Sequence, residues 1–146
     1  MCRDYRLYLV DILIADDKIK RYTKHFDNGN DLLYSELEWD GVIREFEIIG
    51  EATNYLIKNE ILNKNYRIIV DFRNKIIHGY FGIDEVIVWD VIKNYLPEFI
   101  KYIKNFIREN KINLNKIIIQ TKKDHFYNKK VLEFLDNLEY ELKVIK

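Results

Sequence analysis

The side chains best suited to chemistry lie together in residues 71–81, which read DFRNKIIHGYF. Arg73 can neutralise a phosphate through its bidentate guanidinium, and His78 can move a proton near neutral pH. Asn74 adds a side-chain amide, and Tyr80 adds a hydroxyl and a ring that can stack or be modified. This combination of side chains indicates phosphate chemistry on RNA.

The apolar residues of this segment predict that its chemistry is carried near the end of an amphipathic helix. The helix is expected from about Asn63 to His78, and Gly79 is a stop signal just beyond it. Arg73 and His78 are five residues apart, so they point about 140° away from each other on a straight helix. The two side chains can meet only if His78 lies at a frayed helix end or if a second subunit completes the pair. The apolar positions are Ile68, Ile69, Phe72, Ile76 and Ile77.

The same segment resembles the signature of the HepT-like toxins of the HEPN superfamily. That signature is Arg-Asn, three residues, then His-Gly-Tyr-Phe, and residues 73–81 match it throughout. Residues 8–13, 47–52 and 84–97 resemble other helices of the family, so the likeness covers about residues 3–108. One departure is Asn65-Tyr66, where the family usually opens its third helix with Pro-Trp.

The resemblance implies an endoribonuclease toxin that cleaves RNA without a metal ion or other cofactor and works as a homodimer. RNA cleavage by its own 2′-hydroxyl requires one proton to be removed, another to be delivered and a charged phosphorane to be stabilised. We expect His78 to act as acid or base and Arg73 to hold the phosphoryl oxygens. Asn74, Tyr80 and Glu51 are the expected substrate-binding or supporting residues.

The family also pairs with an MNT-type minimal nucleotidyltransferase antitoxin, which transfers AMP to a tyrosine beside the motif. Tyr80 is the only tyrosine within the motif and is the expected site of AMPylation. The added AMP would place bulk and negative charge where a substrate phosphate binds. One alternative is a non-catalytic partner subunit of the nucleotidyltransferase, which holds a nucleotide or substrate. Another is a helical interaction module with no chemistry of its own.

Two carboxylates of the preceding predicted helix, Glu47 and Glu51, lie one turn apart. Either one of them supports the site, or both belong to a solvated acidic face. Gly50 between them allows another helix or subunit to approach closely. Asp71 is expected to pair with Arg67, four residues before it. No group of residues resembles a set of metal ligands, so no metal is expected.

The whole pattern predicts an all-α protein, an antiparallel up-down four-helix bundle of the HEPN type. Its helices are expected at about residues 4–23, 35 or 40 to 58, 63–78 and 84–108, with a break at 25–29. Asp84 should cap the fourth helix, and Pro97 should bend it. Residues 1–108 form this bundle. Residues 109–146 form a basic extension, packed on the bundle or dimer, with a fifth helix at 127–142 and a strand or helix start at 116–120.

Composition fits one domain with a real core, because 48% of the 146 residues are hydrophobic and 33% are charged. No stretch is long enough to span a membrane and no signal peptide is recognisable, so a cytoplasmic protein is expected. Residues 1–100 carry 13 basic and 18 acidic side chains, whereas residues 101–146 carry 11 basic and 6 acidic ones. The basic extension either attracts RNA or docks on the acidic bundle.

Overall fold

The protein is built from helices, which confirms the all-α prediction. The computed structural model describes residues 3–77 and 82–144, and no strand occurs within them. The α-helices are α1 (Tyr5–Thr23), α2 (Gly29–Leu33), α3 (Glu36–Lys58), α4 (Arg67–Ile77), α5 (Glu85–Asp90), α6 (Leu96–Glu109), α7 (Asn115–Asp124) and α8 (Lys129–Val144). A 3₁₀ turn, η1 (Lys64–Tyr66), precedes α4, and a π-helical segment, η2 (Val91–Tyr95), joins α5 to α6.

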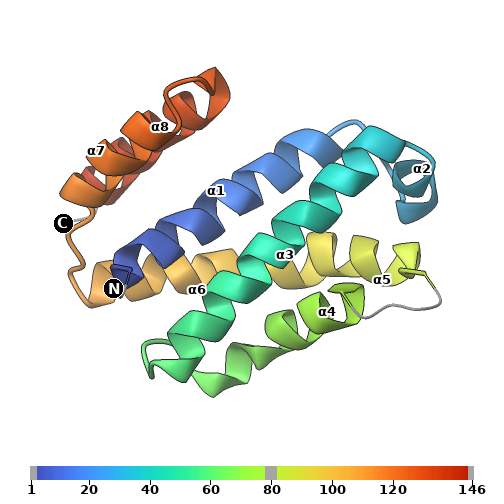
Figure 1. Ribbon diagram of the computed structural model, residues 1–146, viewed down its shortest axis with the longest axis horizontal. Coiled ribbons are helices and arrows are strands. Elements are labelled where there is room, and N and C mark those ends of the chain that lie inside the picture. Colours follow the sequence, from blue (N-terminus) through green and yellow to red (C-terminus); the bar gives the residue numbers. More distant parts are fainter. Residues whose placement is uncertain (1–2, 78–81, 145–146) are drawn as a thin grey trace.

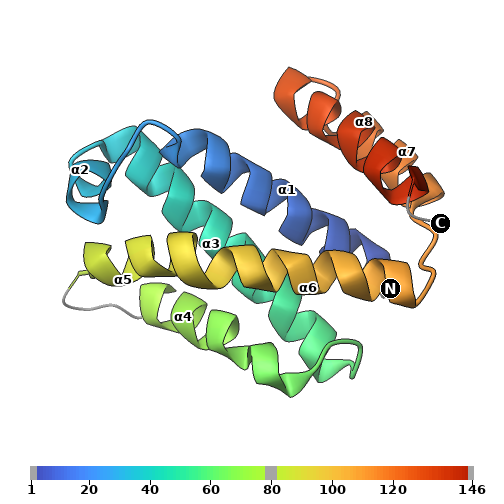
Figure 2. The same ribbon diagram turned by 180° about the vertical axis from the view of Figure 1, so that it is seen from behind.

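Four rods make up the bundle (Figure 1). Helix α1 packs along α3, and α3 packs along α4. The fourth rod is α5, η2 and α6, which follow one another in one line (Figure 2). Short α2 packs against α5 at one end of the bundle. Helices α7 and α8 form a hairpin that lies against α1, outside the four rods.

Most helix starts agree with the sequence signals. The Asp4 carboxylate accepts a hydrogen bond from the backbone N–H of Arg6 at the start of α1. The Asp84 carboxylate accepts from the N–H groups of Val86 and Ile87, so the predicted cap of α5 is confirmed. Such caps satisfy donors that have no partner within the helix.

One short helix, α2, was not predicted, and for a second the sequence left helix and strand open. The expected break after α1 contains α2, whose first turn is stabilised by Asn28 accepting a hydrogen bond from the N–H of Asp31. The first residue of α2 is Gly29, where a side chain does not fit because a Cβ would come within 3.0 Å of the Glu85 carbonyl oxygen. The ambiguous run at 116–120 belongs to helix α7, so the extension holds two helices instead of one.

The sequence predicted that Pro97 bends the fourth helix, but the rod runs in one line (Figure 2) and instead contains η2 before the proline. Pro97 has no N–H, so the carbonyl group four residues earlier loses its usual helical partner. The wider π-helical turn of Val91–Tyr95 lies directly before α6, and Pro97 lies in the first turn of α6. The rod therefore continues past the proline with a local change in hydrogen bonding.

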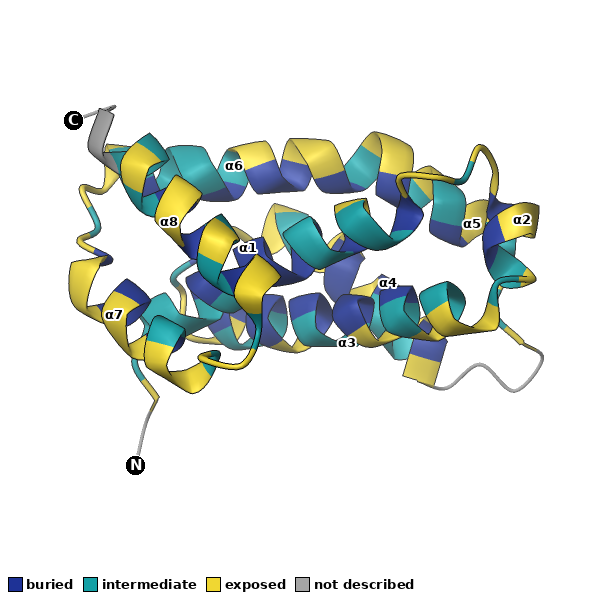
Figure 3. Ribbon diagram, turned by 90° about the horizontal axis from the view of Figure 1, so that it is seen from above, coloured by how far each residue is buried: buried dark blue, intermediate teal, exposed yellow. Residues whose placement is uncertain are grey.

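The core lies where the four rods face one another, as the buried inner surfaces in Figure 3 show. The Phe46 ring of α3 meets Phe72 of α4 edge to face, with 5.0 Å between centroids. Tyr66 of η1 stacks on Tyr102 of α6 at 3.8 Å, which ties the start of α4 to the fourth rod. None of the described helices combines the length and apolar character that a membrane span requires.

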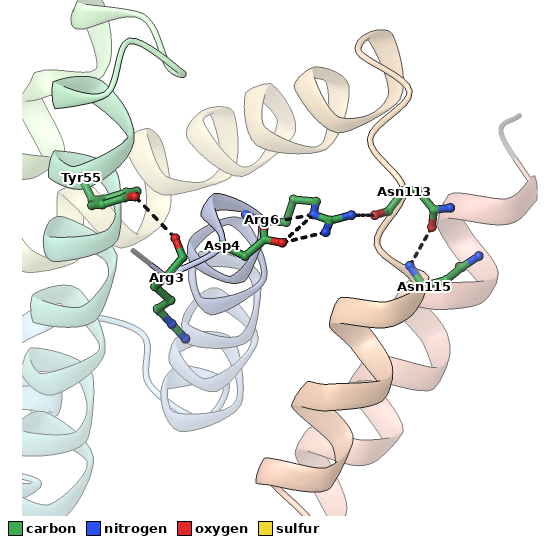
Figure 4. Close-up of polar contacts among 6 residues, drawn as sticks. All are labelled: Arg3, Asp4, Arg6, Tyr55, Asn113 and Asn115. Atoms are coloured by element: carbon green, nitrogen blue, oxygen red, sulfur yellow. Dashed lines mark hydrogen bonds and ion pairs between the residues drawn. The ribbon is translucent and has the colours of Figure 1, made fainter. Parts of the chain in front are cut away.

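The hairpin is attached to the bundle by polar contacts at its base (Figure 4). The Arg6 guanidinium binds the Asp4 carboxylate and donates to the backbone oxygen of Asn113 at 2.9 Å. From α8, the Glu141 carboxylate accepts from Lys104 and Arg108 of α6, with N–O distances of 3.2 and 3.3 Å. These contacts give the hairpin a defined place beside α1.

Candidate active site

The predicted site begins where α3 and α4 touch most closely. Gly50 of α3 faces Arg73 of α4, and a Cβ at position 50 would lie within 3.0 Å of both Cβ and Cγ of Arg73. A side chain at this position would therefore push the two helices apart. The close approach expected of Gly50 is present, and its partner is the stem of the arginine from the motif.

The Arg73 guanidinium is held from both sides. Its Nη1 donates to Oδ1 of Asn74 at 3.0 Å, and its Nη2 lies 3.1 Å from Oε1 of Glu51. The Arg73 side chain is 22% exposed and that of Glu51 is 66% exposed. The structure thus brings three of the predicted site residues into one network at the solvent edge of the α3–α4 contact.

The third nitrogen of the guanidinium is in a different environment. Nε of Arg73 is buried and has no hydrogen-bond partner among the described residues. A substrate phosphate can therefore approach only the Nη1 and Nη2 side, where N–H groups remain available beyond the two bonds in use. The amide nitrogen of Asn74 lies next to them, and no described residue accepts a hydrogen bond from it.

The sequence could not tell which of two carboxylates supports the site, and the tertiary structure distinguishes them. Glu51 reaches Arg73, whereas Glu47, half-buried one turn earlier, makes no hydrogen bond or ion pair within the described ranges. Asp71 pairs with Arg67 at 3.7 Å, as predicted. The Asp71 carboxylate is thereby directed along α4 toward its start and away from Arg73.

The second half of the motif, residues 78–81, lies outside the described residues. The distance from Arg73 to His78, the stop signal at Gly79 and the placement of Tyr80 therefore stay predictions. Helix α4 is described as far as Ile77, so the chain reaches His78 directly from the helix that carries Arg73. Within the described residues, no group of His, Cys, Asp or Glu is arranged to hold a metal ion.

Two of the five apolar residues expected on the inner face of α4 are instead exposed. Ile69, Phe72 and Ile76 are buried, but Ile68 and Ile77 are 59% and 45% exposed. Ile68 lies at one edge of the buried stripe, and Ile77 is the last residue of α4. Ile77 is thus an exposed apolar side chain immediately before His78.

Comparison with known proteins gives the same family across the bundle. The model of the "Ribonuclease HepT-like" family matches residues 12–106. The candidate RNase MJ1380 of Methanocaldococcus jannaschii is 33% identical over 105 residues, which are 70% of this chain and 95% of that protein. The probable ribonuclease HepT of Thermococcus cleftensis is 34% identical over 101 residues, covering 66% and 90% of the two chains. No solved structure shows significant similarity to the chain.

The matched region contains every element of the site. It includes the part of α3 with Gly50 and Glu51, and all of α4 with Arg73 and Asn74. Helices α7 and α8 lie beyond its last residue. From the extent of this match and the identity to its relatives, the chain belongs to the HepT-like ribonuclease family.

Proposed function

We propose that the protein is a metal-independent endoribonuclease toxin that acts in the cytoplasm as a homodimer. The observation that carries the proposal is the Arg73 network. A guanidinium fixed by Asn74 and Glu51 presents N–H groups at the surface in one orientation. A preorganised cation of this kind stabilises charge that develops on a phosphoryl group and needs no rearrangement during the reaction.

The reaction follows from the roles of the motif residues. His78 removes the proton from the 2′-hydroxyl of RNA or protonates the leaving 5′-oxygen. Arg73 binds the non-bridging oxygens of the phosphorane through Nη1 and Nη2, and the Asn74 amide donates a further hydrogen bond. Each chain has one such Arg and one such His, so a two-fold dimer supplies two of each around one scissile phosphate.

Two substitutions test the chemistry. We expect Arg73→Ala and His78→Ala each to lower cleavage of a labelled RNA by at least about 100-fold, because each removes a group that acts in the transition state. Lys75→Ala is the matched control, since Lys75 is an exposed cation two residues from Arg73. Melting curves should show a cooperative transition for all three variants, which confirms that each is folded.

The same cleavage assay tests whether the reaction requires a metal ion. A chelator should leave wild-type cleavage unchanged, and a requirement for a divalent ion would refute the mechanism. Cleavage retained by either the Arg73 or the His78 variant would refute it as well. A wild-type protein that cleaves no RNA but binds ATP would favour the alternative function, a nucleotide-binding subunit of a nucleotidyltransferase.

We further propose that an MNT-type nucleotidyltransferase antitoxin neutralises the enzyme by AMPylation of Tyr80. Two other tyrosines of the bundle, Tyr66 and Tyr95, are poorly placed to accept AMP. The hydroxyl of Tyr95 is buried, and the ring of Tyr66 is stacked on that of Tyr102. Burial also raises the pKa of the Tyr95 phenol, which disfavours the phenolate that would attack ATP.

Mass spectrometry tests this regulation directly. After incubation with a cognate nucleotidyltransferase, ATP and magnesium, the wild-type chain should gain AMP and lose ribonuclease activity. Tyr80→Phe should gain none, whereas the control Tyr66→Phe should be modified like the wild type. AMP on another tyrosine, or on none, would overturn this assignment and leave the ribonuclease proposal standing.

A further inference from the structure

The turn between α7 and α8 gathers exposed aromatic and basic side chains outside the region matched by the family model. Residues 122–130, here called the aromatic turn, read KKDHFYNKK. Phe126 is 79% exposed and Tyr127 is 72% exposed, although both are large apolar side chains. Two adjacent rings with this exposure have no role in the core and are available to a ligand.

The aromatic turn is held in shape by hydrogen bonds. Nδ1 of His125 donates to the Thr121 carbonyl at 2.9 Å, and the N–H of Asn128 donates to the His125 carbonyl at 2.9 Å. The Asn128 side chain accepts from the N–H of Val131 in the first turn of α8. Phe126 and Tyr127 meet edge to face with 5.6 Å between centroids. The two rings are thus presented on a preorganised backbone, which lowers the entropy lost on binding.

Uncompensated positive charge surrounds the rings. Lys122 is neutralised by α8, since its Nζ lies 2.6 Å from Asp136 and 3.2 Å from Glu139. The other three lysines of the aromatic turn form no ion pair within the described part of the chain, and all are exposed. They are Lys123, Lys129 and Lys130. The carboxylate of Asp124, the single acidic residue of the turn, accepts from the amide of Gln120.

We propose that the aromatic turn is a second binding site for single-stranded RNA. Phe126 and Tyr127 stack on unpaired bases, and the three free lysines neutralise the adjoining phosphates. The choice of RNA as the ligand rests on the proposed ribonuclease function. A protein partner fits less well, because lysine is depleted from the cores of protein interfaces.

The position of the turn defines what this site does. The α7–α8 hairpin lies on the α1 side of the bundle, and α4 lies on the opposite side (Figures 1 and 2). The aromatic turn therefore holds a part of the RNA distant from the phosphate bound at Arg73 of the same chain. It raises the local concentration of RNA at the enzyme and takes no part in bond cleavage.

Binding of a non-cleavable RNA tests the inference independently of catalysis. The probe is a fluorescein-labelled 2′-O-methyl oligouridylate, which lacks the attacking hydroxyl, and the full chain is titrated into it while anisotropy is measured. The double variant Phe126→Ala/Tyr127→Ala should raise Kd about fivefold or more, because stacking on an aromatic ring contributes substantially to each base bound. Tyr140→Ala is the matched control, since Tyr140 on α8 is also 72% exposed.

The lysines are tested by salt dependence. Lys129→Gln should reduce the slope of log K against log salt by about 0.7, the value for one phosphate contact with a single strand. Lys116→Gln, an exposed lysine at the other end of α7, should leave the slope unchanged. In cleavage of long RNA, the double aromatic variant should raise KM and keep kcat, because it removes binding and leaves the chemistry intact.

Several outcomes would overturn the inference. The first is that the wild type does not bind the oligonucleotide. The second is that the double variant and Tyr140→Ala lose equal affinity for it. The third is that the rings bind phosphatidylserine vesicles while the protein binds no RNA. Failure of the ribonuclease proposal has a different signature. In that case the oligonucleotide would still bind through Phe126 and Tyr127, and no RNA would be cut. Melting curves confirm that each variant is folded.

Discussion

At the scale of single residues, the contact between Gly50 and Arg73 decides how the site is oriented. The arginine stem rests on the bare backbone of α3, and its head is bound by Glu51 from the same helix. A guanidinium supported at its stem and its head has few other rotamers available. Positioning of this kind is what a cation needs to stabilise a transition state instead of only attracting substrate.

Gly50→Ala should therefore damage both stability and activity. Alanine improves helix propensity by about 1 kcal/mol. Overpacking against the Cβ of Arg73, which can move only with its helix, costs up to about 3 kcal/mol. We expect a net loss of about 2 kcal/mol in chemical denaturation, together with slower RNA cleavage. Gly41→Ala is the control on the same helix, because its Cβ would lie 3.1 Å from the half-buried Tyr22 ring. Equal stability of the two variants would contradict this prediction.

Glu51 is expected to act as a positioning residue for Arg73. Glu51→Ala should lower cleavage up to about fivefold, the range that an exposed ion pair of about 1 kcal/mol allows. Glu51→Gln should retain activity, because its amide oxygen still accepts from Nη2 of Arg73. Glu47→Ala is the control, since Glu47 does not contact the arginine. An equal loss in Glu51→Gln and Glu51→Ala would contradict this prediction and point to a role for the negative charge itself.

At the scale of elements, α1 and α3 each bury an acidic group that weakens the packing of the bundle. Glu45 of α3 is 4% exposed, and no described residue forms an ion pair or hydrogen bond with its carboxylate. Burial raises the pKa of Glu45, and the cations nearby offset only part of this effect. Asp16 of α1 is also 4% exposed, and burial raises its pKa despite its 2.9 Å ion pair with Lys20.

These raised pKa values predict how stability depends on pH. A carboxyl with a raised pKa in the folded state binds more protons there than in the unfolded chain. Stability should therefore fall as pH rises from the ordinary pKa of 4.5 for Glu45 to its raised folded value, and the penalty should persist above that window. Glu45→Gln should raise Tm at neutral pH, and the gain should vanish at pH values below the ordinary pKa.

Thermal melts at several pH values measure this effect. Glu133→Gln on α8 serves as the control, because it also removes one negative charge but from an exposed position. A gain in Tm that is the same at every pH, or that also appears in Glu133→Gln, would assign the effect to net charge. The effect would then have no connection with the burial of Glu45.

At the scale of the whole molecule, charge and exposed apolar surface both indicate where other molecules bind. The bundle is acidic, and the extension is basic. Exposed apolar side chains occur on both helices that carry the predicted site, with Leu37 of α3 81% exposed and Ile77 of α4 45% exposed. We propose that both helices lie near the two-fold axis of the dimer, and these side chains support that arrangement.

Light scattering at micromolar concentration tests the dimer. We expect a mass of twice 17.8 kDa for the wild type. Leu37→Asp should shift the mass toward that of the monomer and reduce cleavage, because a charge at a dimer contact must be desolvated. Tyr140→Asp, on the distant extension, should change neither. A monomeric wild type that still cleaves RNA would show that one chain completes its own site.

The sequence by itself determined the helical class and the family, and it predicts the extent of the bundle and the residues of the site. Apolar periodicity and caps such as Asp84 are local signals, so they identify helices without knowledge of the tertiary contacts. The spacing of Arg73, Asn74 and His78 predicts the chemistry for the same reason, because motif residues on one short segment need no partner to be recognised.

Only the tertiary structure decided which carboxylate meets Arg73 and what supports its stem. Glu47 and Glu51 are equivalent in sequence, but the packing of α4 over Gly50 brings Arg73 to one of them. The structure also shows that residues 116–120 belong to a helix and that Phe126 and Tyr127 lie on an exposed turn. A short apolar run is compatible with both a strand and a helix. Its secondary structure depends on the neighbouring elements, because apolar side chains are buried only by packing against them.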